Sequence, residues 1–413
     1  MSSIRPLIPL LIAAGILLAG NGLQGTLIAL RGAQEGFSAS TIGLMGTSYF
    51  AGFLVGCLVV PRLLQAVGHI RTFAALAAIA SSASLTLILA IEPVTWMVMR
   101  LLCGFCFSGL FMTVDSWINS GVSNKDRASV LSIYRIIDIV AVTGSQYLIP
   151  VFGPGGFTIF AIMAIMISLS LVPVSVGDRS NPQPPESFKL DFRSVWITSP
   201  LACLGCLAIG LTNSAFRLVG PIYARDIGLS VADVATFMSA GILGGAILQY
   251  PFGYLSDRGD RRYVLLMATT GAVLSGLGIT YLAGSSPTLN FAGIFLFGAF
   301  SLPLYSLAAA HANDHAKKGE FVQVAAGLLF FFSLGATIGP VSAAAFVQFG
   351  GPKLLFNYIS LIHALLIFAT IWRMRARGAV PVEGRRRFSG LLRTSTGFNK
   401  LARKPKNAGS GQS

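Results

Sequence analysis

The amino-acid sequence predicts an all-α polytopic membrane protein, with twelve transmembrane helices in two pseudo-symmetric six-helix bundles. Apolar residues make up 54% of its 413 residues and charged residues only 11%, whereas a soluble domain contains about 25% charged residues. The apolar residues form continuous runs of roughly 20, which fit spanning helices and not the alternating strands of a β-barrel. The two halves of the chain also repeat each other.

Turns rich in glycine, proline and charged residues separate the expected spans. The longest interior connection is polar and rich in proline, which is typical of a linker between domains. We therefore expect an N-terminal six-helix bundle at 1–177, a cytoplasmic linker at 178–197, a C-terminal six-helix bundle at 198–374, and a basic, disordered cytoplasmic tail at 375–413. The expected spans are 6–30, 42–61, 72–91, 94–118, 128–150, 156–177, 198–223, 233–253, 263–283, 289–311, 322–348 and 354–374.

The distribution of lysine and arginine predicts the orientation of these spans. Of the 30 basic residues, 24 lie in the loops on one side and in the tail, three lie in the loops on the other side, and three lie inside spans. Because basic loops stay in the cytoplasm, both termini are expected there. The net charge of +15 does not indicate nucleic-acid binding, since the basic residues occupy short loops and the tail instead of one aromatic-lined face.

An internal repeat with an offset of 192 residues supports the division into two bundles. Asn21 aligns with Asn213, Gly52 with Gly244, and Pro61 with Gly253. Such duplication is typical of transporters whose halves rock about a site near the middle of the membrane.

The turn Gly253–Arg262 reads Gly-Tyr-Leu-Ser-Asp-Arg-Gly-Asp-Arg-Arg between two apolar runs. An ionised turn of this kind must face water. Its pattern resembles the loop signature of the major facilitator superfamily of transporters, and the resemblance implies the major facilitator fold. In that family such loops latch the cytoplasmic ends of the helices in one state, which implies this role for Gly253, Asp257, Arg258 and Arg261.

The resemblance extends to the fourth span, where Asp115 matches an acidic position that partners the loop. Arg62 and Arg71 are the expected mates of Asp115. In the repeat-related turn, Gln65 stands in place of Asp257, so we expect a latch that is stronger in the C-terminal half.

Short matches in both halves resemble one branch of the superfamily, the YcaD type. They include Ser48-Tyr49-Phe50 with Gly52, Asp115-Ser116, and Gly298 followed by Tyr305. This branch implies a carrier in the bacterial inner membrane without naming its cargo.

Arg135 and Asp138 are the first candidates for a substrate or proton pathway. They lie three positions apart in the fifth span, so they share a helix face and can neutralise one another. Asp138 follows Arg127 by eleven residues, or about 16 Å, which places it near the middle of the membrane. A carboxyl group there could load and release a proton as access alternates, although a permanent structural ion pair is the alternative.

Four further residues are candidates for the same pathway. Arg100 begins an Arg-x-x-x-Gly run that resembles the superfamily's fourth-helix signature. The resemblance implies a role near proton coupling or substrate anions, and the alternative is that Arg100 reaches the headgroups. Arg217 and Asn213 lie one turn apart and could bind an anionic or polar ligand, or simply pack helices. Asn21 and Asn213 are repeat-related, which favours a shared cavity over isolated interhelical hydrogen bonds.

These patterns predict a secondary active transporter of a small solute that works by alternating access and is coupled to protons. The alternatives are a flippase for lipids or lysophospholipids on the same fold, and a membrane enzyme using His311, Asp314 and His315 on lipid precursors. No phosphate-binding loop or catalytic triad is visible. We expect a monomer in the lipid bilayer that binds a small-molecule substrate and protons, with no catalytic residue, cofactor, metal or nucleic-acid partner.

Overall fold

The structure is a computed structural model that describes residues 7–121, 127–176, 192–317 and 320–376, together with Gly378 and Phe388. The expected linker lies outside these residues except for its last part, which begins the short helix α9 (Phe192–Thr198). The expected disorder of the tail lies almost entirely outside them.

Twelve helical segments in this part of the chain are long and apolar enough to cross a membrane, which confirms the predicted number of spans. Four of these spans are built from two consecutive elements, α5 with α6, α7 with α8, α12 with η2, and α13 with α14. The break between α13 and α14 falls at Pro303, which has no N–H to donate to the preceding turn. The elements are α1 (Ile8–Gln34), α2 (Ala39–Val67), α3 (His69–Leu89), α4 (Pro93–Gly121), α5 (Arg127–Gln146), α6 (Leu148–Phe152), α7 (Phe157–Leu169), α8 (Leu171–Val176), α9, α10 (Pro200–Asp226), α11 (Val231–Arg258), α12 (Arg261–Gly278), the π-helix η2 (Ile279–Ala283), α13 (Pro287–Ser301), α14 (Leu304–His315), α15 (Phe321–Gly350) and α16 (Leu354–Ala376).

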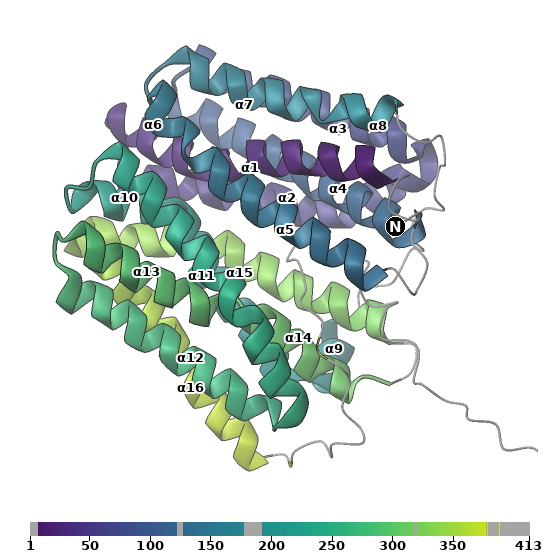
Figure 1. The fold of residues 1–413 in the computed structure, drawn as a ribbon, viewed down its shortest axis with the longest axis vertical. Helices are drawn as coiled ribbons and strands as arrows, with labels where there is room; N and C mark the ends of the chain where they lie inside the picture. Colours follow the sequence, from purple (N-terminus) through teal and green to yellow (C-terminus); the bar gives the residue numbers. More distant parts are fainter. Residues whose placement is uncertain are drawn as a thin grey trace, which may run out of the picture.

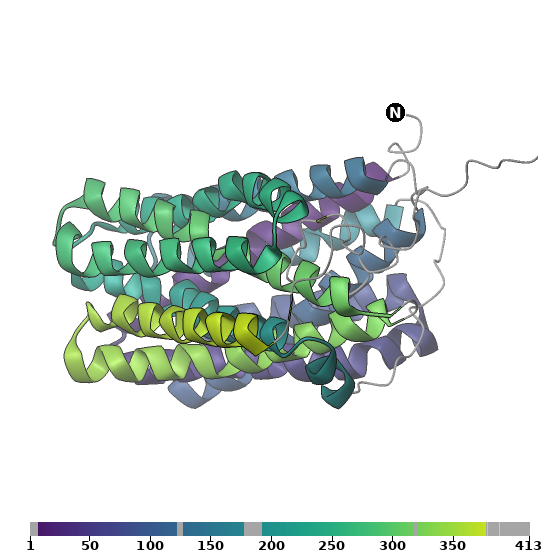
Figure 2. The same ribbon diagram turned by 90° about the horizontal axis from the view of Figure 1, so that it is seen from below.

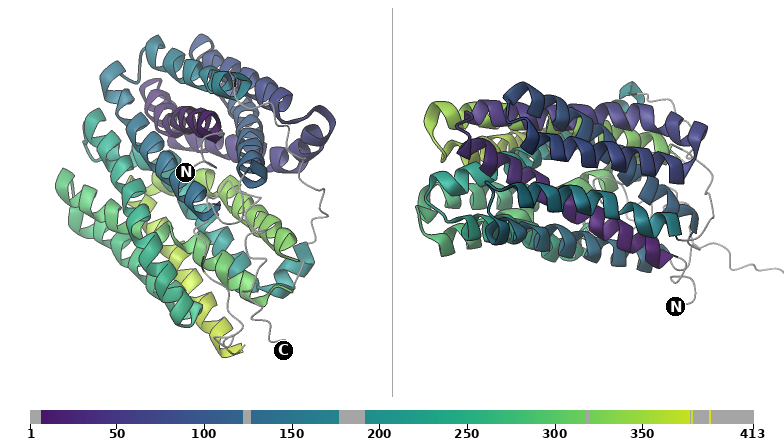
Figure 3. Two further views of the ribbon diagram at one scale, coloured as in Figure 1. Left: turned by 45° about the vertical axis from the view of Figure 1, so that its right-hand side comes forward. Right: turned by 90° about the horizontal axis from the view of Figure 1, so that it is seen from above.

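The helices form two groups that follow the order of the sequence. Figure 1 shows α1 to α8, in purple to blue, gathered above α10 to α16, in green to yellow. The long helices of both groups run in roughly the same direction (Figures 2 and 3). We use "latch face" for the end of the bundle that holds the turn Gly253–Arg262, and "far face" for the end that holds the turn Glu35–Ser38. The latch face is the end predicted to be cytoplasmic.

Repeat-related glycines set the closest helix contacts inside each half. A Cβ atom added at Gly52 of α2 would lie 1.9 Å from the carbonyl oxygen of Leu101 in α4. A Cβ atom added at Gly244 of α11 would lie 2.0 Å from the carbonyl oxygen of Phe295 in α13. Both positions therefore need glycine, because a side chain would force two backbones apart. The repeat seen in the sequence is thus a repeat of packing.

The two halves contact each other closely near the far face. Thr47 in the first half of α2 donates a hydrogen bond of 2.7 Å to the carbonyl oxygen of Thr337 in α15. Gly43 of α2 lies against Ala344 of α15, and Gly25 of α1 lies against the backbone of Arg217 in α10. Close packing at this end is the arrangement expected of a two-bundle protein whose central site is reached from the opposite, latch face.

Substitution of Gly52 by alanine should lower the thermal unfolding midpoint of the purified protein. The added methyl group overlaps the Leu101 carbonyl, and such overpacking costs about 1–3 kcal/mol. Gly144→Ala is the matched control, since nothing lies within 4 Å of the added Cβ and removal of a helical glycine stabilises by roughly 0.5–1 kcal/mol. Equal midpoints for the two variants would contradict this account of the packing.

Candidate functional site

A cavity of about 160 Å³ lies between the two halves. Aromatic side chains from both halves form much of its wall, and a smaller set of polar side chains faces the same space. This combination of apolar walls and few polar groups is typical of a binding site for a small molecule. The polar lining residues are Asn21, Thr26, Arg135, Asp138, Gln146, Asn213, Ser214 and Arg217.

The repeat-related asparagines Asn21 and Asn213 both line this cavity, as their alignment predicted. The side-chain oxygen of Asn21 accepts a 2.8 Å hydrogen bond from the Tyr49 hydroxyl. Asn213 is 4% exposed, and its amide nitrogen has no hydrogen-bond partner among the described residues. A buried amide without a partner is costly, so the Asn213 amide is available to a ligand.

Arg135 and Asp138 form the predicted ion pair, with 3.0 Å between the guanidinium nitrogen and the carboxylate oxygen. A second nitrogen of Arg135 donates to the side-chain oxygen of Gln249 in α11, at 3.3 Å. Gln249 in turn donates to the Ser306 hydroxyl of α14, at 3.3 Å. The ion pair in the first half is thereby connected to two helices of the second half.

Arg100 points into the protein and does not reach toward the headgroups, since it is 4% exposed. One of its terminal nitrogens donates to the side-chain oxygen of Gln24, and its guanidinium carbon lies 4.3 Å from the centroid of the Tyr49 ring. Arg217 lines the same small pocket as Arg100, Gln24 and Tyr49, directly beside the main cavity. The pocket therefore brings together one arginine from each half.

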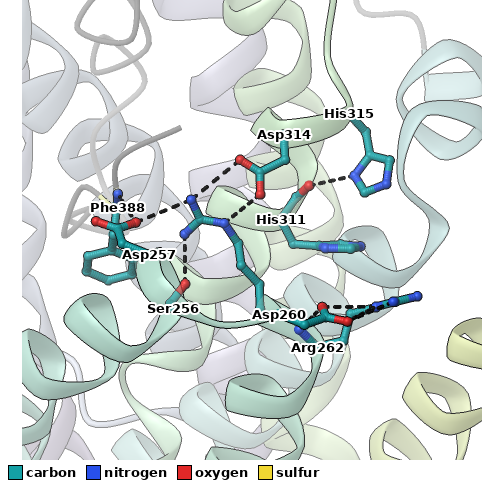
Figure 4. Close-up of polar contacts among 9 residues, drawn as sticks. Ser256, Asp257, Asp260, Arg262, His311, Asp314, His315 and Phe388 are labelled. Carbon is teal, nitrogen blue, oxygen red and sulfur yellow. Dashed lines mark hydrogen bonds and ion pairs between the residues drawn. The ribbon is translucent and has the colours of Figure 1, made fainter. Parts of the chain in front are cut away.

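The latch residues gather around Arg261, whose side chain is 2% exposed. Its guanidinium donates to Asp314 of α14 at 2.6 Å and to the Ser256 hydroxyl at 2.7 Å. It also pairs with Asp257 at 3.3 Å. Figure 4 shows Ser256, Asp257 and Asp314 on different sides of this guanidinium. Arg261 thus ties the start of α12 to the ends of α11 and α14.

Two latch residues, Asp257 and Gly253, contact Phe388 of the tail, and a third, Arg258, lies on the surface. Asp257 accepts a 2.7 Å hydrogen bond from the backbone N–H of Phe388 (Figure 4). A Cβ atom added at Gly253 would lie 2.3 Å from the Phe388 ring, so this glycine leaves room for the ring. Arg258 is exposed and stacks on Tyr254, with 4.2 Å between its guanidinium carbon and the ring centroid.

In the first half, the residue that aligns with Arg261 is His69. Its Nε2 atom lies 2.9 Å from the Ser116 hydroxyl of α4, and Asp115 beside it is 1% exposed. Arg62 and Arg71 are exposed, and their pairing with Asp115 stays a prediction. Applying the 192-residue offset to Arg261 would have identified His69 from the sequence alone.

Asp314, proposed above only for the enzyme alternative, is the main partner of Arg261. In the same segment, Nδ1 of His315 contacts the carbonyl oxygen of His311 at 2.9 Å (Figure 4). Within the described residues, no group of three or more His, Cys, Asp or Glu side chains could hold a metal ion. Asp314 therefore has a structural role in the latch.

The family model described as Major Facilitator Superfamily matches this chain twice, over residues 10–216 and 202–406. Curated relatives cover almost the whole chain. An uncharacterised transporter of this type from Enterobacter sp. (strain 638) is 24% identical over 383 residues, which is 92% of this chain and 98% of the relative. The YcaD transporter of Escherichia fergusonii, also uncharacterised, is 24% identical over 88% of this chain and 95% of its own length.

Two solved structures share the fold at low sequence identity. The nucleoside transporter NupG has a TM-score of 0.76 at 12% identity, covering 90% of this chain and 100% of its own. A bacterial homologue of the human lysosomal transporter Spinster, in an inward-facing and occupied conformation, has a TM-score of 0.73 at 13% identity, covering 92% of this chain and 97% of its own. These likenesses confirm the twelve-helix, two-bundle fold.

Neutralising Arg261 alone should destabilise the protein more than neutralising Arg261 and Asp314 together. Arg261→Gln leaves the buried Asp314 carboxylate without its cation, at a cost of about 3–5 kcal/mol, whereas the double variant with Asp314→Asn removes both charges. Thermal unfolding of purified variants measures the difference. Arg258→Gln, at an exposed position of the same turn, should have an unfolding midpoint near that of the wild type. Equal decreases of the midpoint in all three proteins would contradict a central structural role for Arg261.

Proposed function

This chain belongs to the Major Facilitator Superfamily, and we propose that it moves a small solute across the bacterial inner membrane by alternating access coupled to protons. It is a multi-pass membrane protein and a secondary transporter. The proposed orientation has both termini in the cytoplasm, because 24 of the 30 basic residues lie on that side or in the tail.

The central cavity is the observation that carries this proposal. It lies between the halves, it is lined by Asn21 and Asn213 at repeat-related positions, and it contains the ion pair of Arg135 and Asp138. A site shared by two repeats can be exposed to either side of the membrane when the halves rock. Close packing near the far face favours access from the latch face in this conformation.

Asp138 is the proposed proton carrier. When its carboxylate is ionised, it holds Arg135, which also contacts Gln249 in the other half. Protonation of Asp138 removes the charge that holds the guanidinium, so Arg135 is free to change its contact with α11. A proton on one side chain can in this way alter the contact between the halves, as coupling requires.

Asp138→Asn should abolish solute accumulation driven by a pH gradient while leaving solute exchange intact. The amide keeps the shape of the carboxyl group but cannot carry a proton. Uptake and counterflow in proteoliposomes, with a solute first identified by thermal-shift screening, measure the two activities. Asp233→Asn, in the exposed turn at the start of α11, is the matched control. Gradient-driven accumulation at the wild-type level in Asp138→Asn would exclude Asp138 as the carrier, and movement of lysophospholipids alone would favour the flippase.

A further inference from the structure

We propose that the transported solute is a small organic anion whose carboxylate or phosphate group binds between Arg100 and Arg217. This inference rests on the proposed transport function and specifies the class of substrate. The two arginines line one pocket beside the central cavity. Arg100 comes from α4 in the first half and Arg217 from α10 in the second. An anion held by both would therefore touch both halves at once.

The charges in this region do not balance without a ligand. The contacts of Arg100 in the described structure are with Gln24 and the Tyr49 ring, which carry no full negative charge, and its Nε atom has no hydrogen-bond partner. Arg217 forms no ion pair among the described residues. In contrast, Arg135 in the same cavity is already paired with Asp138.

Two guanidinium groups inside a membrane protein remain charged, because arginine does not give up its proton there. Their mutual repulsion and lost hydration are costly in a medium of low dielectric constant. A carboxylate or phosphate offsets both costs, and its oxygens match the planar fork of donors on each guanidinium. The side-chain amide nitrogen of Asn21, which lines the same pocket, can supply a further hydrogen bond.

The rest of the cavity indicates what the anion is attached to. Phe50, Phe53, Phe111, Phe216 and Phe332 line it, so an apolar or aromatic body fits beside the charged end. The pocket lies in the interior between the halves, and Gly25 and Gly46, which contact Arg217 and Leu218 of the other half, line it. A cavity of about 160 Å³ in this place suits a small soluble molecule better than a phospholipid with its chains.

Thermal-shift measurements on the full-length purified protein test the proposal with four matched probes: 3-phenylpropionate, its amide, the corresponding amine 3-phenylpropylamine, and phenyl phosphate. The two anions should raise the unfolding midpoint saturably, and the amide and amine should not. Arg100→Gln and Arg217→Gln should each weaken the apparent affinity for the anions at least tenfold. Arg217→Lys, which keeps the charge without the fork, should weaken it less. Arg225→Gln, at an exposed arginine paired with Asp226, is the control and should bind as wild type.

Stabilisation by the amine or amide, equal responses in all variants, or no response to either anion would overturn the anion site. Stabilisation by lysophosphatidylglycerol alone would overturn the assignment to a soluble solute. A separate proteoliposome assay keeps the two proposals apart. Transport of a neutral solute alone would support the transport function and contradict the anion site. Specific anion binding without transport of any solute would support the anion site and contradict the transport function.

Discussion

An ionised side chain that is buried away from water takes its position from the partner that replaces the water. Arg135 has Asp138 beside it on the same helix face, and Arg261 has Asp314 on a neighbouring span. The second pair joins α12 to α14, and Arg135 of the first pair also contacts Gln249 of α11. Arg100 has neutral partners instead, and that difference separates the groups that maintain the fold from the group that can recognise a ligand.

The same constraint explains why the two ends of the molecule differ. Near the far face, the halves meet through glycines and hydroxyl groups, such as Gly43 and Thr47 of α2, which permit close backbone approach without any charge. At the latch face, water is available and charged turns are permitted. The contacts there involve Arg261, Asp257 and a residue of the tail. The far face therefore depends on packing and the latch face on electrostatics. Salt and pH should affect the contacts at the latch face more than those at the far face.

Much of the fold followed from the sequence because membrane insertion leaves strong local signals. Continuous apolar runs fixed the number of spans, and the 192-residue offset related Gly52 to Gly244 before their identical packing roles were visible. The spacing of Arg135 and Asp138 predicted their ion pair, since two residues three positions apart share a face of any helix. Contacts between distant segments of the chain were harder to predict from the sequence. Asp314 as the partner of Arg261, and Phe388 on Gly253, depend on which helices meet in space, and no local pattern contains that information.

The glycine crossings inside each half have a mechanical consequence. At Gly52 and Gly244 two helix backbones touch with no side chain between them, so neither helix can approach the other more closely. A helix that tilts in its half therefore turns about this point of contact. Its two ends then move in opposite directions, so that a tilt at the cavity is accompanied by a displacement at the membrane surface.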